Sequence, residues 1–501
     1  MEKNLFKWYL PPLILILFIL HLGFVLKNPD RILADPGTGW QLKTGEILIK
    51  TWQLPELEPF SYTASETSWV LYQWLFQALL GALQLAGGIP LVTVVCALVL
   101  GWTLMLLMQR MVEQKSTIFF SLLAVFAFWL VLTMHIQARP HVMTYLLFCI
   151  YLLQFERASR EQGTWIQLIR HLLLLPFLMI LWCNFHGGFV TGIMLCGIFW
   201  VGSVLDAMAG KKKELWEKSL VYLSCFFASG VASLFNPYGF KLHQTIFSYL
   251  NFNTLKYYDE FVTPFTQHSA NVTIFKGTIL LLLLLLARSK TKLSWAEIGC
   301  LLVFLYYAIE SVRHVILFML VAVPITARFA TQWVEESLPS LSSIFIRITK
   351  EQNEMKGGVA YAIVISLVFI SLVWLKPDVF RKNLDGIRLS AESVEYIKVN
   401  RDKFQRMFNT EDLGGALIYS FSPKIKVFVD DRVDAYGDDF FLKTYLPILQ
   451  MKDGWYNTFE SRHITSAILS KDSPIGSELM LRGWSLVHED ELNKLYLKKL
   501  N

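Results

Sequence analysis

Charged residues are scarce in this chain. Asp, Glu, Lys and Arg make up only 17% of its 501 residues, whereas 54% are hydrophobic. A composition this poor in charge excludes an ordinary soluble domain and indicates an integral membrane protein. The net charge of +6 is modest, and we expect membrane lipid rather than nucleic acid as a partner.

The sequence also lacks cysteine pairs at metal-site spacing and a signal-peptide cleavage site. The cysteines lie in or beside apolar runs and are interpreted as small core residues, at positions 96, 149, 183, 196, 225 and 300. Lys3 and Lys7 precede the first apolar run, and no Ala-x-Ala-like segment follows it. We therefore expect an uncleaved signal anchor with a cytoplasmic N-terminus.

Long apolar runs recur along the first three quarters of the chain. An α-helix needs roughly 20 residues to cross a bilayer, and these runs are near that length. The eleven runs cover residues 9–26, 90–109, 117–134, 142–155, 171–184, 189–208, 219–235, 274–287, 294–309, 315–331 and 357–375. The sequence therefore predicts a mainly α-helical polytopic membrane protein with about eleven transmembrane helices.

A further apolar segment, 69–86, is assigned from the distribution of charge. If it does not cross the membrane, the cytoplasmic loops carry twelve Lys and Arg residues in total, in 110–116, 156–170, 209–218 and 288–292. The opposite loops carry four, in 135–141, 184–188, 236–273 and 310–314. Because cytoplasmic loops are enriched in Lys and Arg, we expect 69–86 to be an amphipathic helix in the outer-leaflet interface, anchored by Trp69, Tyr72 and Trp74.

The composition changes after Lys376. Residues 376–501 predict a small extracytoplasmic α/β domain, which follows a transmembrane domain 1–375 with its first outer loop at 27–89. The expected strands are 416–419, 426–429, 467–470, 484–488 and 494–498, and the expected helices are 391–399, 440–450 and 475–482. Segment 332–356 is expected to form a helix on the cytoplasmic surface.

This topology places the unusual polar motifs at the outer face. Asp35 and Glu46 lie in the first outer loop, together with Trp40. Short loops between spans supply the other candidates, Arg139, His141, His186, Arg313 and His314. Each has an ordinary explanation, because glycine-rich loops turn the chain and an arginine at a span end reaches to the interface. Their convergence favours a shared functional vestibule, since charge near the membrane core is costly.

A carboxylate beside cations suits transfer from a lipid phosphate. The planar fork of arginine matches a pair of phosphate oxygens, and a carboxylate can take the proton of an acceptor. Residues 430–439 add five acids, among them Asp430 and Asp434 beside Arg432. This stretch either holds a divalent cation through its oxygens or forms a solvated loop, and we favour the loop.

Several motifs are individually weak but specific as a group, and they cover nearly the whole chain. They are 35–46 (DPGTGWQLKTGE), 58–63 (EPFSYT), 73–75 (QWL), 138–141 (ARPH), 184–188 (NFHGG), 236–239 (NPYG), 313–314 (RH), 414–418 (GGALI) and 427–437 (VFVDDRVDAYG). In this combination the chain resembles the GT-C superfamily of polytopic glycosyltransferases. More narrowly, it resembles a bacterial group of membrane proteins with a C-terminal extracytoplasmic α/β domain.

The resemblance implies a function and a location. It implies inverting transfer of a sugar from a polyprenyl-phosphate-linked donor to an acceptor at the outer face of the bacterial inner membrane. Asp35 is then the general base, and the donor phosphate is held by Arg139, His186, Arg313 and His314. Two positions depart from the pattern, because Gln41 stands where His is expected and Asp431 where Gly is expected.

Two other classes of function stay open. A non-catalytic scaffold of cell-envelope assembly would keep the fold without the reaction, and Gln41 is consistent with it. A lipid or solute transporter would carry polar groups at mid-span and broken helices in symmetric halves, whereas the polar motifs of this chain gather at one face. Replacing Asp35 by Asn separates a transferase from a scaffold, because a scaffold tolerates the loss of one loop charge.

Overall fold

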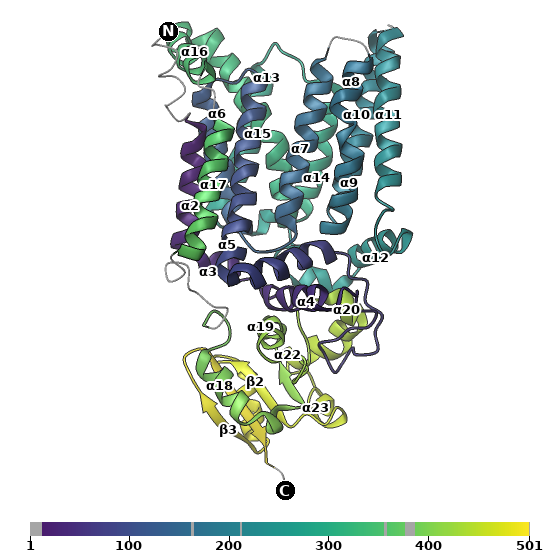
Figure 1. Ribbon diagram of the computed structural model, residues 1–501, viewed down its shortest axis with the longest axis vertical. Helices are drawn as coiled ribbons and strands as arrows, with labels where there is room; N and C mark the ends of the chain where they lie inside the picture. The colour runs from purple at the N-terminus through teal and green to yellow at the C-terminus, as the bar shows by residue number, and fades with distance from the viewer. Residues whose placement is uncertain (1–12, 162–164, 211–212, 355–357, 376–385, 500–501) are drawn as a thin grey trace.

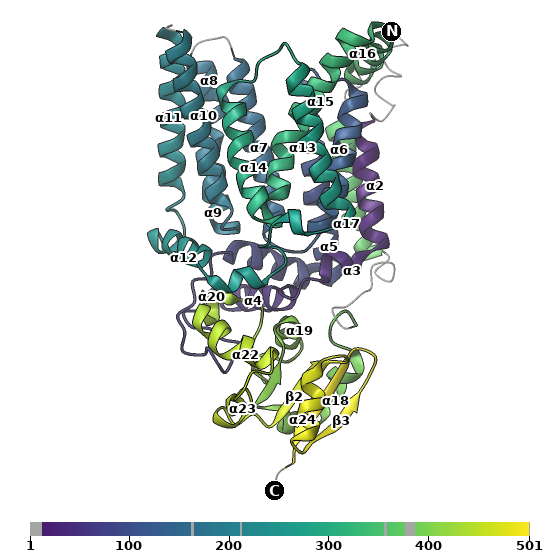
Figure 2. The same cartoon turned by 180° about the vertical axis from the view of Figure 1, so that it is seen from behind.

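The computed structural model describes residues 13–161, 165–210, 213–354, 358–375 and 386–499. A bundle of upright helices forms the larger part, and a smaller region with a β-sheet lies beyond one end of it (Figure 1). Short helices run across that end of the bundle, between the two parts, as the view from behind also shows (Figure 2).

The upright helices account for all of the predicted spans. They are α2 (Ile14–Lys27), α5 (Trp74–Glu113), α6 (Ile118–Leu132), α7 (His141–Arg160), α9 (Leu174–Phe185), α10 (Phe189–Gly210), α11 (Lys213–Ala232), α13 (Ala270–Arg288), α14 (Trp295–Glu310), α15 (Val315–Ser337) and α17 (Gly358–Leu375). Each predicted run overlaps one of them. Seven stretches of the described chain are by themselves long and apolar enough to cross a membrane. The protein is thus a polytopic helical membrane protein, and the number of crossings stays a prediction.

Helix α15 lies at the centre of the bundle. Every residue from Val315 to Ala327 is buried, and α6, α13 and α14 pack around it. A helix that is apolar on all sides is stable only when it is surrounded in this way. Helix α17 instead exposes large hydrophobic side chains over much of its length, as expected of a helix that faces lipid.

Shorter helices complete the membrane part. They are α3 (Pro29–Leu33), α4 (Thr38–Thr51), η1 (Thr133–His135), α8 (Trp165–Leu172), α12 (Phe240–Leu250), η2 (Asn253–Tyr257), η3 (Pro264–Thr266), η4 (Val312–His314) and α16 (Pro339–Glu354). Helices α3, α4 and α12 lie across the end of the bundle that faces the sheet region, whereas α16 lies at the opposite end (Figure 1). Helix α16 accounts for most of the predicted surface helix 332–356.

Helix α5 changes direction at Gly87 and Gly88, where the backbone leaves helical geometry and Gly88 adopts a φ of 71°. Its first part corresponds to the predicted interfacial helix. That helix begins at Trp74 rather than at residue 69. Trp69 is not an interfacial anchor, because its indole is only 4% exposed and packs on the rings of Trp40 and Phe60. Its burial in an aromatic cluster overrides its preference for an interface.

Helices α4 and α5 cross in direct backbone contact. A Cβ atom on Gly45 would lie 2.0 Å from the carbonyl oxygen of Gln77, and a Cβ on Gly81 would lie 2.3 Å from the carbonyl carbon of Gly45. Only glycine permits so close an approach. The crossing therefore fixes the two helices where they border the sheet region.

The smaller region contains a four-stranded sheet in the order β1-β2-β4-β3. β1 (Met407–Asn409) runs parallel to β2 (Ser466–Ser470), whereas β4 (Asn493–Lys498) is antiparallel to β2 and to β3 (Trp484–Glu489). Its helices are α18 (Ala391–Val399), η6 (Arg401–Phe404), α19 (Glu411–Phe421), α20 (Val433–Tyr436), α21 (Asp438–Phe440), η7 (Phe441–Tyr445), α22 (Leu446–Leu449), α23 (Asn457–Ser461) and α24 (Pro474–Leu481).

Most of the elements predicted for this region are confirmed. The helices at 391–399 and 475–482, the helical stretch at 440–450 and the last three strands are present. The strand predicted at 416–419 is wrong, because these residues lie within α19. A short apolar run does not by itself distinguish a buried strand from a helix. The strand predicted at 426–429 is reduced to one isolated bridge, between Val427 and Ser61 of the first loop.

Candidate functional site

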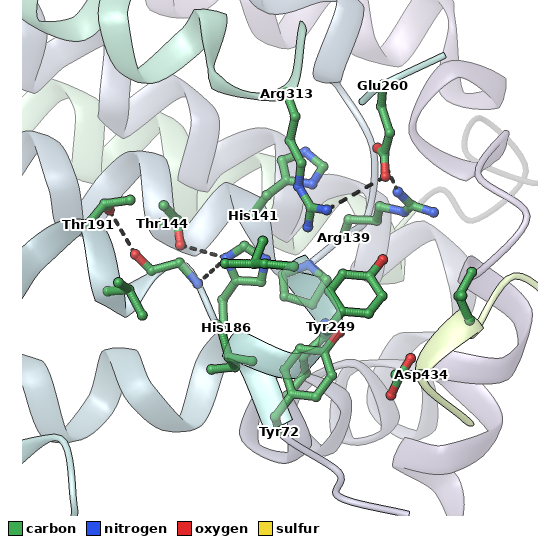
Figure 3. A pocket seen from close by; sticks show the side chains of 18 of the residues that line it. Tyr72, Arg139, His141, Thr144, His186, Thr191, Tyr249, Glu260, Arg313 and Asp434 are labelled. Carbon is green, nitrogen blue, oxygen red and sulfur yellow. Dashed lines mark hydrogen bonds and ion pairs between the residues drawn. The ribbon is translucent and has the colours of Figure 1, made fainter. Parts of the chain in front are cut away.

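A cavity of about 300 Å³ lies where the bundle meets the sheet region. Its wall combines α4, the start of α5, α7, α12, the loops 186–188 and 258–261, and residues 431–434. Its size is that of a small-ligand pocket. Figure 3 shows charged, imidazole and phenol side chains from several of these elements pointing into one space.

The structure brings together most of the residues singled out in the sequence. The cavity wall includes Trp40, Arg139, His141, His186, Arg313, His314, Arg432 and Asp434. Asp35, Glu46 and Asp430 lie outside it. Glu46 forms ion pairs of 2.9 Å with Lys43 and 2.6 Å with Lys50 along α4.

Three carboxylates surround the guanidinium of Arg139. Asp35 Oδ2 lies 2.6 Å from Nε, Glu260 Oε2 lies 3.2 Å from Nη1, and Asp431 Oδ2 lies 3.1 Å from Nη2. Arg139 is therefore held in place by the first loop, the loop after α12 and the sheet region together. All three of its guanidinium nitrogens contact carboxylates of the protein. We therefore assign Arg139 a role in positioning these segments rather than in binding a ligand.

Asp35 is buried and forms an ion pair with Arg139. Its side chain is 2% exposed, and its second oxygen accepts a hydrogen bond of 2.8 Å from the Gly37 N–H. Gly37 separates Asp35 from Asp431, since a Cβ there would lie 3.0 Å from Asp35 Oδ1 and 2.7 Å from Asp431 Oδ2. The glycine-rich loop thus allows two carboxylates to approach one guanidinium.

Asp431, which was noted in the sequence only as a departure from the family pattern and not as a site residue, lines the cavity itself. The Trp40 indole donates to its Oδ1 at 2.8 Å. Burial raises the pKa of Asp431 to about 7, against the opposing effect of Arg139 and with the support of Asp35 and Asp430. The acidic run 430–434 was a signal for this residue, although the sequence does not show which acid faces the cavity.

One ring nitrogen of His186 is hydrogen-bonded within the protein (Figure 3). Trp182 Nε1 donates to Thr144 Oγ1 at 2.9 Å, so the Thr144 hydroxyl can donate to His186 Nδ1, 2.8 Å away. The Gly188 N–H also donates to Nδ1, at 3.2 Å. Burial and the neighbouring Arg313 lower the pKa of His186 well below its usual value. The imidazole is therefore neutral, with its proton on Nε2.

Arg313 is much less engaged than Arg139. Its Nη1 lies 3.7 Å from Glu260 Oε1, and its guanidinium stands 5.0 Å over the Phe261 ring. Within the described part of the chain, no shorter ion pair of this guanidinium is present. Although burial raises the pKa of Glu260, the guanidinium groups of Arg313 and Arg139 lower it to about 2. Glu260 therefore stays ionised and anchors both arginines.

Arg432 belongs to a buried cluster. It donates to Asp430 from Nε at 2.7 Å and to Glu58 from Nη2 at 2.6 Å, and its guanidinium stands 4.7 Å over the Trp69 ring. Asp430 also accepts from the Tyr436 hydroxyl at 2.8 Å. These contacts join the sheet region to the first loop, and they give Asp430 and Arg432 a structural task.

Most carboxylates of the acidic stretch 430–439 have partners within the protein. Asp431 bonds Arg139 and Trp40 as described, Asp438 accepts from the Thr254 N–H at 2.7 Å, and Asp439 pairs with Lys443 at 2.8 Å. The interpretation of this stretch as a metal-binding segment finds no support in these contacts. The carboxylates around Arg139 converge on its guanidinium rather than on one point.

One group of side chains within the described residues has the proximity that a metal needs, namely Glu392, His488 and Asp490 in the sheet region. Asp490 is already engaged, since Oδ1 accepts from the N–H groups of Leu492 and Asn493 at 2.9 and 2.8 Å. Its other oxygen accepts from Ser390 and Ser393. This carboxylate organises a turn, and we derive no reaction step from a metal.

No protein-family model and no curated protein sequence matches this chain. Solved structures do match it. The oligosaccharyltransferase of Archaeoglobus fulgidus in its apo form has a TM-score of 0.55 and 10% identity, over 91% of this chain and 69% of that one. AglB of the same organism, in complex with an inhibitory peptide and a dolichol-phosphate, has a TM-score of 0.50 and 10% identity, over 87% and 65%. ArnT from Cupriavidus metallidurans has a TM-score of 0.46 and 11% identity, over 96% and 97%.

This chain spans about two thirds of the length of the oligosaccharyltransferases that it matches. At 10% identity the likeness concerns the fold and not the reaction. Oligosaccharyltransferases have the GT-C fold, and the likeness in fold extends over 87% and 91% of this chain. The chain is a membrane protein with the GT-C fold.

Proposed function

We propose that the protein is an integral membrane glycosyltransferase that transfers a sugar from a polyprenyl-phosphate-linked donor. The observation that carries the proposal is the cavity at the end of the bundle, where an under-engaged arginine, a neutral histidine N–H and a cavity-lining carboxylate face one space. These groups are the ones that phosphate binding and proton removal require.

Arg313 and His186 are the proposed ligands of the donor phosphate. The guanidinium of Arg313 retains donors for two phosphate oxygens, and His186 Nε2–H adds a neutral donor. His186 ends α9 and Arg313 lies in η4, so both come from the ends of bundle helices, where a lipid-linked phosphate would arrive. Arg139 is assigned a positioning role, because its three nitrogens are bonded to carboxylates. His141 and His314 complete the wall.

Asp431 is the proposed general base. The sequence predicts Asp35 for this role, but the geometry favours Asp431 because it lines the cavity and Asp35 does not. For a hydroxyl acceptor, the acceptor oxygen bonds to the anomeric carbon of the sugar while the bond from that carbon to the phosphate oxygen breaks. The electron pair leaves with the polyprenyl phosphate, and the hydroxyl proton passes to Asp431.

The proposed orientation places the cavity and the sheet region outside the bacterial inner membrane. The described parts of the basic loops predicted to be cytoplasmic lie at the opposite end of the bundle, where cytoplasmic Lys and Arg are expected. Lipid-linked sugar would then enter from the outer leaflet, and the acceptor would approach beneath the sheet region.

The decisive experiment is the binding of undecaprenyl phosphate to the purified full chain in detergent or nanodiscs. We expect saturable binding, and Arg313→Ala should weaken it by about 10- to 100-fold, as loss of a charge-assisted contact implies. Arg462→Ala is the matched control, because Arg462 also stands over an aromatic ring, Phe440 at 5.8 Å, but lies outside the cavity. Absence of binding by the wild type would reject the transferase and favour a non-catalytic scaffold.

A further inference from the structure

Arg313, the proposed phosphate ligand, lies against a short turn in the loop between α12 and α13. This turn consists of residues 258–261, and across it the Tyr258 carbonyl accepts a hydrogen bond of 2.9 Å from the Phe261 N–H. The Glu260 carbonyl accepts one of 3.0 Å from the Arg313 N–H, and the Arg313 guanidinium stands 5.0 Å over the Phe261 ring. Both the backbone and the side chain of Arg313 therefore depend on where the turn lies.

No tight salt bridge fixes the Arg313 guanidinium independently of the turn. Within the described part of the chain, its closest carboxylate is Glu260 at 3.7 Å, and Figure 3 shows the two side chains facing each other. Glu260 itself belongs to the turn. A displacement of the turn would consequently move the carboxylate, the aromatic ring and the backbone oxygen that surround Arg313.

The turn is connected to the sheet region by a side-chain hydrogen bond. The Tyr258 hydroxyl donates to Glu411 Oε2 at 2.6 Å, across 153 positions of the sequence. Tyr258 lines the cavity wall, and its ring packs against the hydrophobic cluster formed by the sheet region and the first loop. An oxygen of Glu411 can accept this hydrogen whether or not the acid is ionised. The contact therefore joins the residue that begins the turn to the sheet region.

Glu411 has a fixed position in the sheet region. It is the first residue of α19, and its N–H donates to the Tyr445 hydroxyl at 2.8 Å. Helix α19 lies in direct backbone contact with the first loop, because a Cβ on Gly415 would lie 2.0 Å from the Pro36 carbonyl oxygen. A Cβ on Gly39 would likewise lie 2.1 Å from the Gly415 carbonyl oxygen. So close an approach leaves α19 little freedom to shift.

A second contact holds the same loop at a greater distance from Arg313. Asp438 accepts hydrogen bonds from the N–H groups of Asn253 and Thr254 at 3.1 and 2.7 Å, and neither of these residues lines the cavity. Among the hydrogen bonds between this loop and the sheet region in the described chain, that of Tyr258 lies closest to Glu260. The Tyr258 hydroxyl is thus the contact best placed to fix the turn.

We propose that Tyr258 and Glu411 are positioning residues for the donor phosphate. Their hydrogen bond holds the 258–261 turn against the sheet region, and the turn in its place holds Arg313. Because binding depends on the placement of the guanidinium to within a fraction of its contact distance, the sheet region takes part in binding the donor. This inference rests on the proposed function and adds that the region beneath which the acceptor approaches also sets the affinity for the lipid phosphate.

Removal of one hydroxyl group tests the proposal. Tyr258→Phe in the full chain keeps the ring and should raise the Kd for undecaprenyl phosphate about 3- to 10-fold, as the loss of one hydrogen bond implies. Tyr257→Phe is the matched control, because this neighbouring phenol is 61% exposed and lies outside the cavity wall. Its Kd should stay within about 2-fold of the wild type.

The partner of the hydroxyl provides a second variant and its rescue. Glu411→Ala removes the acceptor and should weaken binding as much as Tyr258→Phe does. The two changes together should weaken it no further, because both break one hydrogen bond. Glu411→Gln keeps a carbonyl oxygen that accepts from a phenol, and it should restore most of the affinity that Glu411→Ala loses.

The same substitution is then made in the Arg313→Ala background. If Tyr258 acts through Arg313, Tyr258→Phe should change the Kd by less than about 2-fold once the guanidinium is absent. A hydroxyl that only stabilises the fold would instead lower the melting temperature and weaken lipid binding equally in both backgrounds. The difference between the two backgrounds therefore separates positioning from stability.

Several outcomes would overturn the inference. If Tyr258→Phe binds undecaprenyl phosphate as the wild type does, the hydrogen bond does not position Arg313, and the proposed function stands. The inference also fails if Tyr258→Phe weakens binding equally with and without Arg313. If Glu411→Gln binds as weakly as Glu411→Ala, the charge of the acid and not the hydrogen bond is responsible. If the wild type binds no undecaprenyl phosphate, the proposed function fails as well.

Discussion

The two ends of the helical bundle each hold a cavity with arginine in its wall, and the two differ in how that arginine is paired. The end that faces away from the sheet region has a cavity of about 280 Å³. There Arg110 lies 2.5 Å from Glu156, Arg160 lies 2.9 Å from Glu113, and Arg328 lies 2.7 Å from Glu297. Each of these guanidinium groups is bonded to a carboxylate of the protein.

At the end that faces the sheet region, the pairing is incomplete. Arg139 and Arg432 are enclosed by carboxylates, but Arg313 comes no closer than 3.7 Å to Glu260. The comparison teaches that cavities of similar size differ in whether each arginine in the wall is closely paired with a carboxylate of the protein. An arginine without a close carboxylate can bind an anionic ligand, and the following experiments test that contrast.

Asp431→Asn should have the largest effect, on turnover. Loss of a general base lowers the rate by about 10²- to 10⁴-fold, whereas undecaprenyl phosphate affinity should change little because Arg313 and His186 remain. Single-turnover sugar transfer and lipid binding, measured on the same preparation, separate the two. Equal turnover by the wild type and the variant would show that Asp431 is not the general base. Asp35 would then be the preferred candidate for that role.

The pKa of Asp431 also predicts how turnover depends on pH. Burial raises the pKa of Asp431 from 3.8 to about 7, so the base becomes active only as it loses its proton, and turnover should rise with a midpoint near pH 7. The groups that face it are Arg139, Asp35, Asp430, Trp40 and Tyr258. Asp434, whose pKa burial raises to about 6, is the rival. Asp434→Asn should keep the midpoint of the wild type, and a shifted or missing midpoint would assign the titration to Asp434.

The sign for stability is opposite to that for turnover. The folded protein holds the Asp431 proton more tightly than the unfolded chain does, so its contribution is fully present below pH 3.8 and is lost as the pH rises towards 7. Thermal unfolding of the wild type over this range should show the decline, and Asp431→Asn should flatten it.

Glu156→Ala tests the arginine–carboxylate ion pairs at the end of the bundle that faces away from the sheet region. Removing this carboxylate leaves the buried Arg110 without a charged partner, which costs about 3–5 kcal/mol of unfolding free energy. The folded fraction should still bind undecaprenyl phosphate with the wild-type affinity. Thermal unfolding and lipid titration measure the two effects, and lost affinity with unchanged stability would contradict the assignment of structural and binding tasks to the two ends.

Gly45→Ala should have an intermediate effect. The new methyl group would lie 2.0 Å from the Gln77 carbonyl oxygen, so α4 and α5 must separate, at a cost of about 1–3 kcal/mol. The melting temperature should fall accordingly. Gly277→Ala in α13 is the control, because a Cβ at Gly277 meets no atom within 4 Å. An unchanged melting temperature for Gly45→Ala would refute the rigid crossing.

Glu46→Gln should have the smallest effect. Its partners Lys43 and Lys50 are partly or largely exposed, and such pairs contribute about 0.2–1 kcal/mol. Neither lipid affinity nor turnover should change, because Glu46 lies outside the cavity wall. A loss of turnover would show that the first loop approaches the substrate differently from its arrangement in this structure.

Sequence patterns were informative where the determining physics is local. The apolar runs identified every upright helix because a membrane-length hydrophobic segment forms a helix wherever it lies in the chain. The order of these spans also indicated that Arg139, His186 and Arg313 meet at one end, since alternate loops of a polytopic chain lie on the same side. Strand 416–419 failed because a short apolar run fits a buried helix equally well.

Only the tertiary structure distinguishes charged side chains that are paired within the protein from those that can bind a ligand. The sequence treats Arg139, Arg313 and Arg432 alike, and it does not separate Asp431 from Asp430 or Asp434. The pairing of Trp40 with Asp431 joins residues 391 positions apart, and that of Glu58 with Arg432 joins residues 374 positions apart. Composition and periodicity determined the helical membrane body, because burial of apolar surface acts on each segment. Which polar groups keep a free donor or acceptor depends on the partner that distant segments bring, and only the folded chain fixes it.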